Sequence, residues 1–180
     1  INGNFYMEDN IASNGVVRVI DGVFTPSWIF NSVQDRIVEN ADLSTLFSLL
    51  AMTAIILSDP AVPVTVVGPT NAAFALLDPA QVEFLTTTPE GLIQLTRILQ
   101  YHVFPGIFVS NELSDGITVD TLEGGTVEVS VGEDGVFFND AKAVQVDILA
   151  NNGVVHKIDT VLDPADGVEQ KGGGKNGKRN

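Results

Sequence analysis

The sequence predicts an α+β fold, with helices from the first half of the chain packed on one side of an antiparallel sheet built by the second half. Apolar residues recur at helical spacing between residues 43 and 103, whereas six short β-type segments follow residue 106. A long internal repeat also indicates one whole domain together with a piece of a second. Helices and strands that are segregated along a chain are typical of α+β domains, in which the helices cover one face of the sheet.

The first predicted helix lies between residues 43 and 57. Its apolar side chains recur at three- and four-residue spacing and are Leu43, Leu46, Phe47, Leu50, Ala54 and Leu57. Asp42 precedes this run as a favourable N-cap, and Pro60 would end the helix because proline cannot continue its hydrogen bonds. The longest apolar stretch, residues 46–57, is much shorter than the roughly 20 residues that cross a bilayer, so we expect a core helix.

A strand and a turn follow this helix. Residues 64–67 form a short β-type segment that leads into Pro69, Thr70 and Asn71, a turn that opens a short helix at Ala72. The side chains of Thr70 and Asn71 can hydrogen-bond the free backbone N–H groups at the start of that helix.

A third helix is predicted from its start signal. Thr88 is an N-cap residue, and Pro89 is suited to the first helical position because it has no N–H group to leave unpaired. The apolar face that follows is Leu92, Leu95, Leu99 and Val103. Pro105 and Gly106 are expected to end the helix.

The second half of the chain is predicted to be β. The β-type segments are 107–109, 117–122, 126–131, 136–138, 144–149 and 154–161, separated by turns that contain Gly and Asp. Asn152-Gly153 is the strongest hairpin signal, with a positive φ expected at Gly153, and it should pair 144–149 with 154–158. Asp147 and Asp159 flank this hairpin, where we expect their carboxylates to accept hydrogen bonds from backbone N–H groups.

The domain organisation is predicted from the repeat. Residues 14–26 match residues 152–164 at an offset of 138, with eight of thirteen positions identical. A period far above the roughly 20–50 residues of solenoid repeats indicates a repeating domain. We therefore interpret 1–26 as the C-terminal end of a preceding copy, 27–164 as one complete copy and 165–180 as a Gly/Lys-rich tail or linker. The alternative is two unrelated Asn-Gly hairpins that converged.

The N-terminal segment carries more apolar side chains than a lone hairpin can bury. They are Phe5, Ile11, Val16, Val17, Ile20, Val23 and Phe24. Because an isolated two-stranded hairpin is marginally stable at best, the segment needs a docking surface on this domain, on a neighbouring chain or on an assembly partner. A contact outside the domain is favoured, since the complete copy already has its own closing hairpin at 144–161.

Composition and charge exclude several classes of function. The formal net charge is −14, and residues 1–164 carry five cations against 21 acids, which is −16. Nucleic-acid binding is excluded, because such binding requires cations that displace the counterions of the phosphates. The chain contains no cysteine, so disulfides, thiolate metal sites and cysteine nucleophiles are excluded as well.

Three motifs in order resemble those of the fasciclin (FAS1) domain. They are a strand that runs into a Pro-Thr-Asn turn and an Ala-Phe helix at 65–74, a Tyr-His pair at 101–102, and a closing segment at 147–164. The structural residues of the first and third motifs are Thr65, Pro69, Thr70, Asn71, Phe74, Asn152, Gly153, His156 and Asp159. Val67-Gly68 departs from the aromatic and Ala usual in the first motif, and Arg18 replaces the expected His in the partial copy. The resemblance covers about residues 32–164 and implies a wedge of antiparallel β-sheets with a cluster of helices from the first half of the domain.

The resemblance also implies a binding role. In animal members of the family, the Tyr-His pair with its apolar flanks and the Asp-Ile segment are implicated in contacts with cell-surface receptors. The matching residues here are Tyr101, His102, Val103, Phe104, Asp147, Ile148 and Leu149. The apolar members of this set are also what a core requires, and burial is the favoured interpretation for most of them.

No motif of the sequence indicates an enzyme. His102 and His156 are the two histidines, each within an apolar run, and hydrogen-bonded core or helix-end residues are favoured over catalytic ones. At a helix C-terminus His102 would favour the protonated form. Gly-x-Ser-x-Gly, His-Glu-x-x-His and P-loop patterns are absent from the sequence. No catalytic residue, cofactor or metal site is therefore predicted.

These observations predict a non-catalytic adhesion or protein–protein interaction module, located outside the cell or at the cell surface. Its partners would be proteins, either cell-surface proteins or subunits of an assembly. The alternative is a structural accessory subunit docked on a large assembly in an organelle lumen.

Overall fold

The computed structural model describes the backbone of residues 6–13, 15–20, 29–53 and 55–164, with burial and side-chain contacts for residues 29–53 and 55–164. The predicted tail at 165–180 and the burial of the seven apolar residues within 1–26 lie outside the described residues. Those predictions are therefore not tested by the structure.

Helices dominate the first half of the described domain and strands the second half, as predicted. The helices are α1 (Val33–Glu39), the 3-10 turn η2 (Ala41–Leu43), α2 (Ser44–Ala51), α3 (Asn71–Ala75), α4 (Pro79–Thr87) and α5 (Pro89–Tyr101). The strands are β1 (Tyr6–Ala12), β2 (Gly15–Ile20), β3 (Val64–Pro69), β4 (Val103–Pro105), β5 (Ile117–Asp120), β6 (Thr126–Gly132), β7 (Gly135–Phe138), β8 (Ala141–Ala150) and β9 (Gly153–Ile158).

The main sheet has the strand order β4-β3-β9-β8-β7-β6-β5. Its neighbours are antiparallel except for β3 and β9, which pair in parallel with Val64 opposite Gly153 and Pro69 opposite Ile158. The expectation of a purely antiparallel sheet is therefore corrected. The last of the described strands, β9, enters the sheet between β3 and β8, a long-range pairing that local sequence patterns do not reveal.

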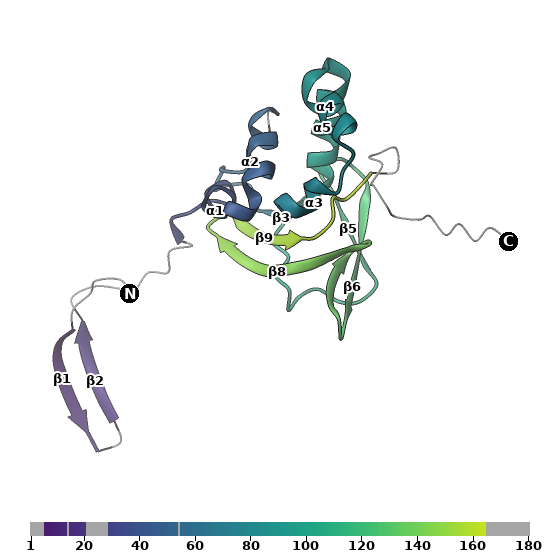
Figure 1. Cartoon of the computed structure of the whole chain (residues 1–180). Coiled ribbons are helices and arrows are strands. Elements are labelled where there is room, and N and C mark those ends of the chain that lie inside the picture. Colours follow the sequence, from purple (N-terminus) through teal and green to yellow (C-terminus); the bar gives the residue numbers. More distant parts are fainter. Residues whose placement is uncertain (1–5, 14, 21–28, 54, 165–180) are drawn as a thin grey trace.

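The helices gather over one side of this curved sheet (Figure 1). One core cluster lies between the helices and the sheet and includes Val33, Leu46 and Leu99, while a second lies within the curved sheet and includes Phe104 and Phe138. The sheet curls far enough that the Leu122 N–H, just beyond β5, donates to the Val103 oxygen of β4 over 2.8 Å. Two cores therefore meet at the central strands β3 and β9.

The start of α5 confirms its sequence signal, whereas the start of α2 does not. Thr88 caps α5 by accepting a hydrogen bond from the Gly91 N–H, with Pro89 as the first helical residue. Asp42 lies inside η2, and α2 begins only at Ser44 without a local side-chain cap. Instead, the Thr45 N–H donates to Asn71 Oδ1 over 2.9 Å. A side chain from a later turn thus replaces the predicted local cap.

Two further boundaries differ from the prediction. Helix α2 ends at Ala51, well before Pro60, so the apolar residues beyond it belong to the following segment. The strand expected at 107–109 is instead β4 at 103–105, directly after the α5 helix. Gly106 follows β4 with a φ of 109°, a value that few residues other than glycine adopt, and there the chain leaves the sheet.

The N-terminal hairpin has the same turn register as the hairpin that closes the domain. In the pair β1–β2, Ala12 lies opposite Gly15, and in β8–β9, Ala150 lies opposite Gly153. Both pairs are separated by the same offset of 138 residues as the sequence repeat. The backbone pairing is thus what a preceding copy of the domain would produce, although the division into repeats stays a prediction.

Candidate functional site

The Tyr-His segment lies at the end of α5 and in β4, inside the core. The exposed fractions of Tyr101, His102, Val103 and Phe104 are 7%, 1%, 1% and 0%. The Tyr101 hydroxyl donates to the Thr126 backbone oxygen over 2.8 Å, which ties α5 to β6. In the folded domain these four side chains are not available to a partner, so their role here is packing.

His102 is a neutral core residue. Its Nδ1 lies 2.7 Å from the Ile98 oxygen, and its Nε2 accepts a hydrogen bond from the Leu162 N–H over 2.9 Å. These partners assign the proton to Nδ1. Burial lowers the pKa of His102 to about 4, an effect that outweighs the opposing hydrogen bond to Ile98. The expected protonated imidazole is therefore wrong, because the ring is enclosed rather than at an exposed helix end.

Asp147 anchors the loop that follows β4. It adopts a φ of 59°, uncommon for a residue other than glycine, where the β8–β9 register shifts between Gln145 and Ile148. Its Oδ1 accepts from the Ser110 N–H over 2.8 Å, and its Oδ2 accepts from the Ser110 hydroxyl. The predicted role of Asp147 in satisfying a backbone donor is thus confirmed. The same holds for Asp159, whose Oδ1 accepts from the Lys142 N–H over 2.9 Å.

His156 holds the same loop from the neighbouring strand. Its Nε2 donates to the Phe108 oxygen over 2.8 Å, and its Nδ1 accepts from the Asp147 N–H over 3.3 Å. Burial lowers the pKa of His156, and the Phe108 carbonyl and the Asp147 carboxylate oppose this shift less strongly. Phe108 is also held through its N–H, which donates to Thr65 Oγ1 over 2.9 Å.

These contacts place a serine, an aspartate and a histidine close together without forming a nucleophilic relay. The Ser110 hydroxyl donates to the Asp147 carboxylate, whereas His156 contacts the Asp147 backbone. A serine nucleophile needs a base that accepts its proton and is itself oriented by a third group. Here both ring nitrogens of His156 bond the backbone, so the cluster acts as a clamp on the 106–110 loop.

The Tyr-His segment and the Asp147 clamp are joined through aromatic packing. The ring centroids of Phe104 and Phe138 are 6.0 Å apart, and those of Phe138 and His156 are 5.7 Å apart. The core packing around Phe138 therefore connects the Tyr-His segment to His156 of the Asp147 clamp.

The first motif is architectural. The Thr70 hydroxyl accepts from the Ala73 N–H over 3.3 Å and caps α3, as predicted. Asn71 also donates from Nδ2 to the Ala41 oxygen over 2.9 Å, so it fixes the η2–α2 junction. Pro69 ends β3, and Phe74 packs half-buried against the helical core.

Asn152 and Gly153 are required for reasons that the hairpin pattern does not give. The two turn residues are Asn151 and Asn152, and the φ of Gly153 lies outside the left-handed region, so the predicted positive φ is wrong. A Cβ atom at Gly153 would lie 1.8 Å from the Val64 oxygen. Glycine is therefore required at position 153 because the backbone of β3 passes close to it.

Asn152 is buried and joins three segments of the domain. Its Oδ1 accepts from the Val33 N–H at the start of α1 over 2.8 Å, and its Nδ2 donates to the Leu57 and Asp59 oxygens. The hairpin turn is thus bound to the helical layer and is not a free surface loop.

Of the predicted binding residues, Leu149 is the one whose side chain is exposed, at 39%, while Ile148 packs toward the helical core. Two residues that sequence analysis did not single out, Ile29 and Phe30, are also exposed, to 41% and 69%. The Asn151 N–H donates to the Asn31 oxygen over 2.8 Å, which joins the two segments. We name Ile29, Phe30 and Leu149 the β8 patch. Ile29 and Phe30 belong to no helical or strand periodicity, which explains why the sequence did not reveal them.

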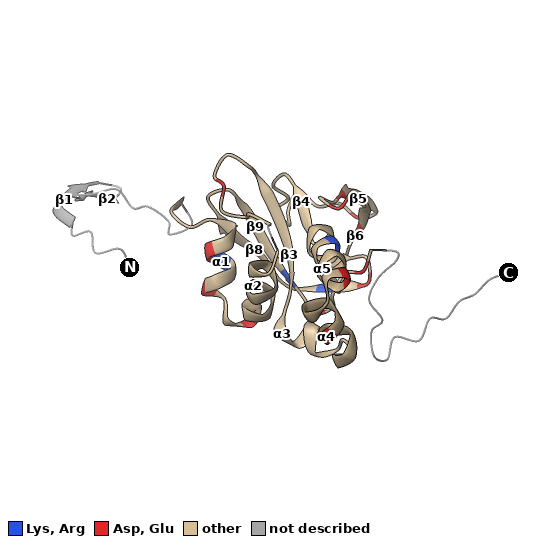
Figure 2. Cartoon of the chain, turned by 90° about the horizontal axis from the view of Figure 1, so that it is seen from above, with Lys and Arg blue, Asp and Glu red and all other residues tan. Residues whose placement is uncertain are grey.

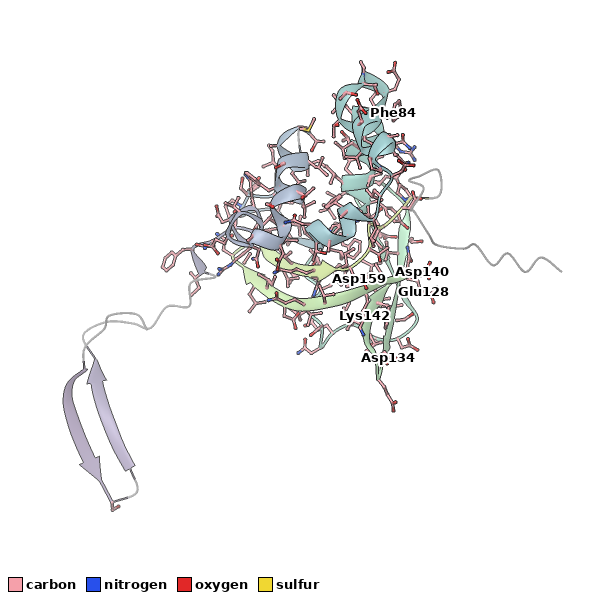
Figure 3. All side chains as sticks on the ribbon, viewed as in Figure 1. Phe84, Glu128, Asp134, Asp140, Lys142 and Asp159 are labelled. Atoms are coloured by element: carbon pink, nitrogen blue, oxygen red, sulfur yellow. The ribbon has the colours of Figure 1, made fainter. Side chains whose placement is uncertain are left out.

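The surface around these elements is acidic. Three of the described cations are in ion pairs, with N–O distances of 2.8 Å for Arg36–Glu39, 2.7 Å for Arg97–Glu123 and 3.1 Å for Lys157–Asp42. Asp and Glu residues, coloured red on the ribbon in Figure 2, are spread over the helices and strand ends. Lys142 lies on the strand side of the domain together with the carboxylates labelled in Figure 3.

Among the residues that the structure describes, no group of three or more His, Asp or Glu side chains could hold a metal ion. Within the same residues no helix is long and apolar enough to cross a membrane.

Comparison with known proteins assigns the chain to a family. The model of the fasciclin domain matches residues 41–164. The chain belongs to the fasciclin family. The resemblance drawn from the three motifs is thus confirmed, and a single domain is matched, so the tandem organisation remains a prediction.

Relatives of this fasciclin domain occur in animals and cyanobacteria. The chain is 36% identical to human periostin over 159 residues, which is 87% of the chain and 18% of periostin. It is 39% identical over 133 residues to the uncharacterized protein sll1735 of Synechocystis, covering 71% of the chain and 96% of that protein. The chain therefore spans less than a fifth of periostin but nearly all of the cyanobacterial protein.

A solved structure confirms the α+β FAS1 fold. A FAS1 domain pair from the insect cell adhesion molecule Fasciclin I matches with a TM-score of 0.64 and 15% identity, covering 91% of this chain and 60% of that chain.

Proposed function

We propose that this fasciclin domain is a non-catalytic adhesion or protein-interaction module that works outside the cell or at its surface. The observation that carries the proposal is the β8 patch, where Ile29, Phe30 and Leu149 are exposed on a fold shared with an insect cell adhesion molecule. Exposed apolar groups within a charged surround are typical of protein-interaction sites.

The chemistry of the candidate residues supports a non-catalytic role. His102 and His156 each use both ring nitrogens in hydrogen bonds inside the domain. The Ser110 hydroxyl and the Asp147 carboxylate bond each other. A general base needs a free ring nitrogen or carboxylate within reach of a substrate proton. The residues most suited to chemistry therefore hold the fold together.

The predicted repeat supports an arrangement in tandem. The equal turn registers of β1–β2 and β8–β9 are what two copies of one domain would give. We propose that residues 1–26 complete a preceding copy and that its neighbour, or a protein partner, covers their apolar side chains.

The adhesion proposal is tested by attachment of cells from the source organism to surfaces coated with the chain. We expect the wild-type chain to support attachment and the double variant Phe30→Ser, Leu149→Ser to reduce it at least tenfold. Val144→Ser is the matched control, because Val144 is 55% exposed at the other end of β8. No attachment by the wild-type chain, or equal attachment by the double variant, would overturn the proposal.

The accessory-subunit alternative makes a different prediction. Size-exclusion chromatography and crosslinking of native extract would then show the chain in one complex of fixed stoichiometry. Weak and heterogeneous crosslinks are expected for the adhesion module.

A further inference from the structure

An apolar pocket of about 310 Å³ opens between the helices, and none of the β8 patch residues lines it. Helices α2, α4 and α5 supply its walls, and the short helix α3 lies between their bases (Figures 1 and 2). The apolar groups that line it include Leu49, Phe74, Val82, Leu85, Leu95 and Ile98. Protein interiors rarely leave spaces much larger than a water molecule, so a pocket of this size requires an explanation.

Four polar side chains line the pocket, and those other than Thr45 already have hydrogen-bond partners within the domain. Asn71 bonds the start of α2, the Thr86 hydroxyl donates to the Val82 oxygen over 2.9 Å, and both nitrogens of His102 are occupied. No lining residue carries a charge, since His102 is neutral. Water gains little in such a site, because a buried water normally makes about three hydrogen bonds.

The absence of charge extends beyond the lining. Residues 43–77, which contain α2, β3 and α3, hold one charged residue, Asp59, in a chain of net charge −14. Helix α2 is also apolar on its outer side, where Phe47 is 37% exposed, and Met52 just past its end is 46% exposed. The nearly uncharged surface formed by residues 43–77 suits uncharged molecules, whereas the acidic remainder of the protein surface repels anions.

We propose that this pocket binds one uncharged, apolar small molecule. The volume lies at the lower end of the range of about 300–1,000 Å³ that is typical of ligand pockets. Binding is driven by burial of apolar surface and requires no hydrogen bond from the wall. This site does not rest on the adhesion proposal, because Ile29, Phe30 and Leu149 do not line it.

The probe for the test is N-phenyl-1-naphthylamine, which is neutral and fluoresces in apolar surroundings, with 1-dodecanol as the competitor. Titration of the full chain is expected to show saturable binding at one probe per chain. Dodecanol is expected to displace the probe and to raise the melting temperature, since a ligand that binds the folded state stabilises it.

Two matched pairs of variants locate the site. Ala75 and Ala72 are both exposed on α3, but Ala75 lines the pocket and Ala72 does not. Likewise, Thr86 lines the pocket and its neighbour Thr87 does not. We expect Ala75→Phe and Thr86→Glu to weaken probe binding at least tenfold, by filling the mouth and by placing a charge in the wall. Ala72→Phe and Thr87→Glu are expected to bind within twofold of wild type.

Several results would overturn this proposal. They are the absence of saturable binding, equal binding by Ala75→Phe and Ala72→Phe, or loss of binding on Phe84→Ser. Phe84 is an exposed side chain at the outer end of the α4–α5 pair, outside this pocket (Figure 3). Light scattering tests a further alternative. If the chain is a dimer that does not bind the probe, and if Ala75→Phe converts it to a monomer, then the pocket is occupied by a second copy of the chain instead. Circular dichroism of each variant establishes that it is folded.

Discussion

The Tyr101–Phe104 segment and the Asp147–Leu149 segment differ in which sides of their strands are covered. Strand β4, which carries Val103 and Phe104, is enclosed by the two cores and by the closing contact from Leu122. Strand β8 packs Ile148 inward and exposes Leu149 on its outer face. Apolar character alone thus does not distinguish an exposed strand residue from a core residue. Whether other elements cover a face of the strand decides whether its apolar side chains are buried or exposed. Strand β9 lies between the two regions and is part of the sheet that connects them.

Gly153→Val is expected to have the largest effect, because it breaks the strand that joins the two regions. The new side chain would meet the Val64 backbone, and neither backbone can move without separating β3 from β9. We expect loss of the cooperative thermal transition. Gly132→Val is the control, since a Cβ atom at Gly132 meets no heavy atom within 4 Å. A folded Gly153→Val variant with the wild-type melting temperature would contradict the close-approach explanation.

Phe104→Ala tests the buried region. The ring is fully buried against Phe138, so its removal should lower the free energy of unfolding by about 3–5 kcal/mol, as for other buried aromatic residues. Phe84→Ala, at a residue 42% exposed, should change it by less than about 1 kcal/mol. Urea denaturation at neutral pH measures both, and equal losses would show that Phe104 is not a core residue in solution.

Acid is expected to lower the free energy of unfolding of the domain through His102 and His156. Both pKa values are lowered in the fold, that of His102 to about 4, so the unfolded chain takes up protons first as the pH falls. The stability that the neutral His102 ring contributes is complete above about pH 6.5 and is lost toward pH 4, at up to about 1.4 kcal/mol per pH unit, and His156 adds a loss in the same direction. Denaturation between pH 7.5 and 5.5 measures this slope, and His102→Gln should reduce it. A slope that His102→Gln leaves unchanged would contradict this assignment.

Leu149→Ser should have the smallest effect on stability and a clear effect on binding. Because its side chain is already partly in water, we expect a change of less than about 1 kcal/mol in the free energy of unfolding. Attachment in the coated-surface assay should nevertheless fall. A large loss of stability would place Leu149 with the core residues and remove the contrast between the two segments.

Local signals in the sequence were sufficient wherever a segment is stabilised by its own residues. Thr88 and Pro89 locate the start of α5, and Thr70 locates that of α3. Helix α1 also has a local signal, a capping box formed by Ser32 and Asp35, but its short length hides it among loop residues. Such elements can be predicted from sequence.

Long-range contacts account for what the sequence did not reveal. The cap of α2 comes from the side chain of Asn71. Glycine is required at position 153 because the Val64 backbone lies too close for a Cβ atom. The carboxylate of Asp147, at the irregular part of β8, is bonded by Ser110 on a distant loop. For the candidate site, the motif residues were identified, but their burial and the exposure of Phe30 depend on which strands cover them. The pocket depends on the spacing of four helices, which no single segment encodes.

The position of β9 has a consequence for biosynthesis. Of the strands that the structure describes, this one leaves the ribosome last, yet it lies between β3 and β8 in the finished sheet. Until residues 153–158 emerge, a nascent chain exposes the unpaired edges of both neighbours, and such edges readily pair with other chains. Folding of the domain is thus deferred to the end of its translation, and a product truncated before Gly153 is expected to aggregate rather than to persist as a smaller soluble unit.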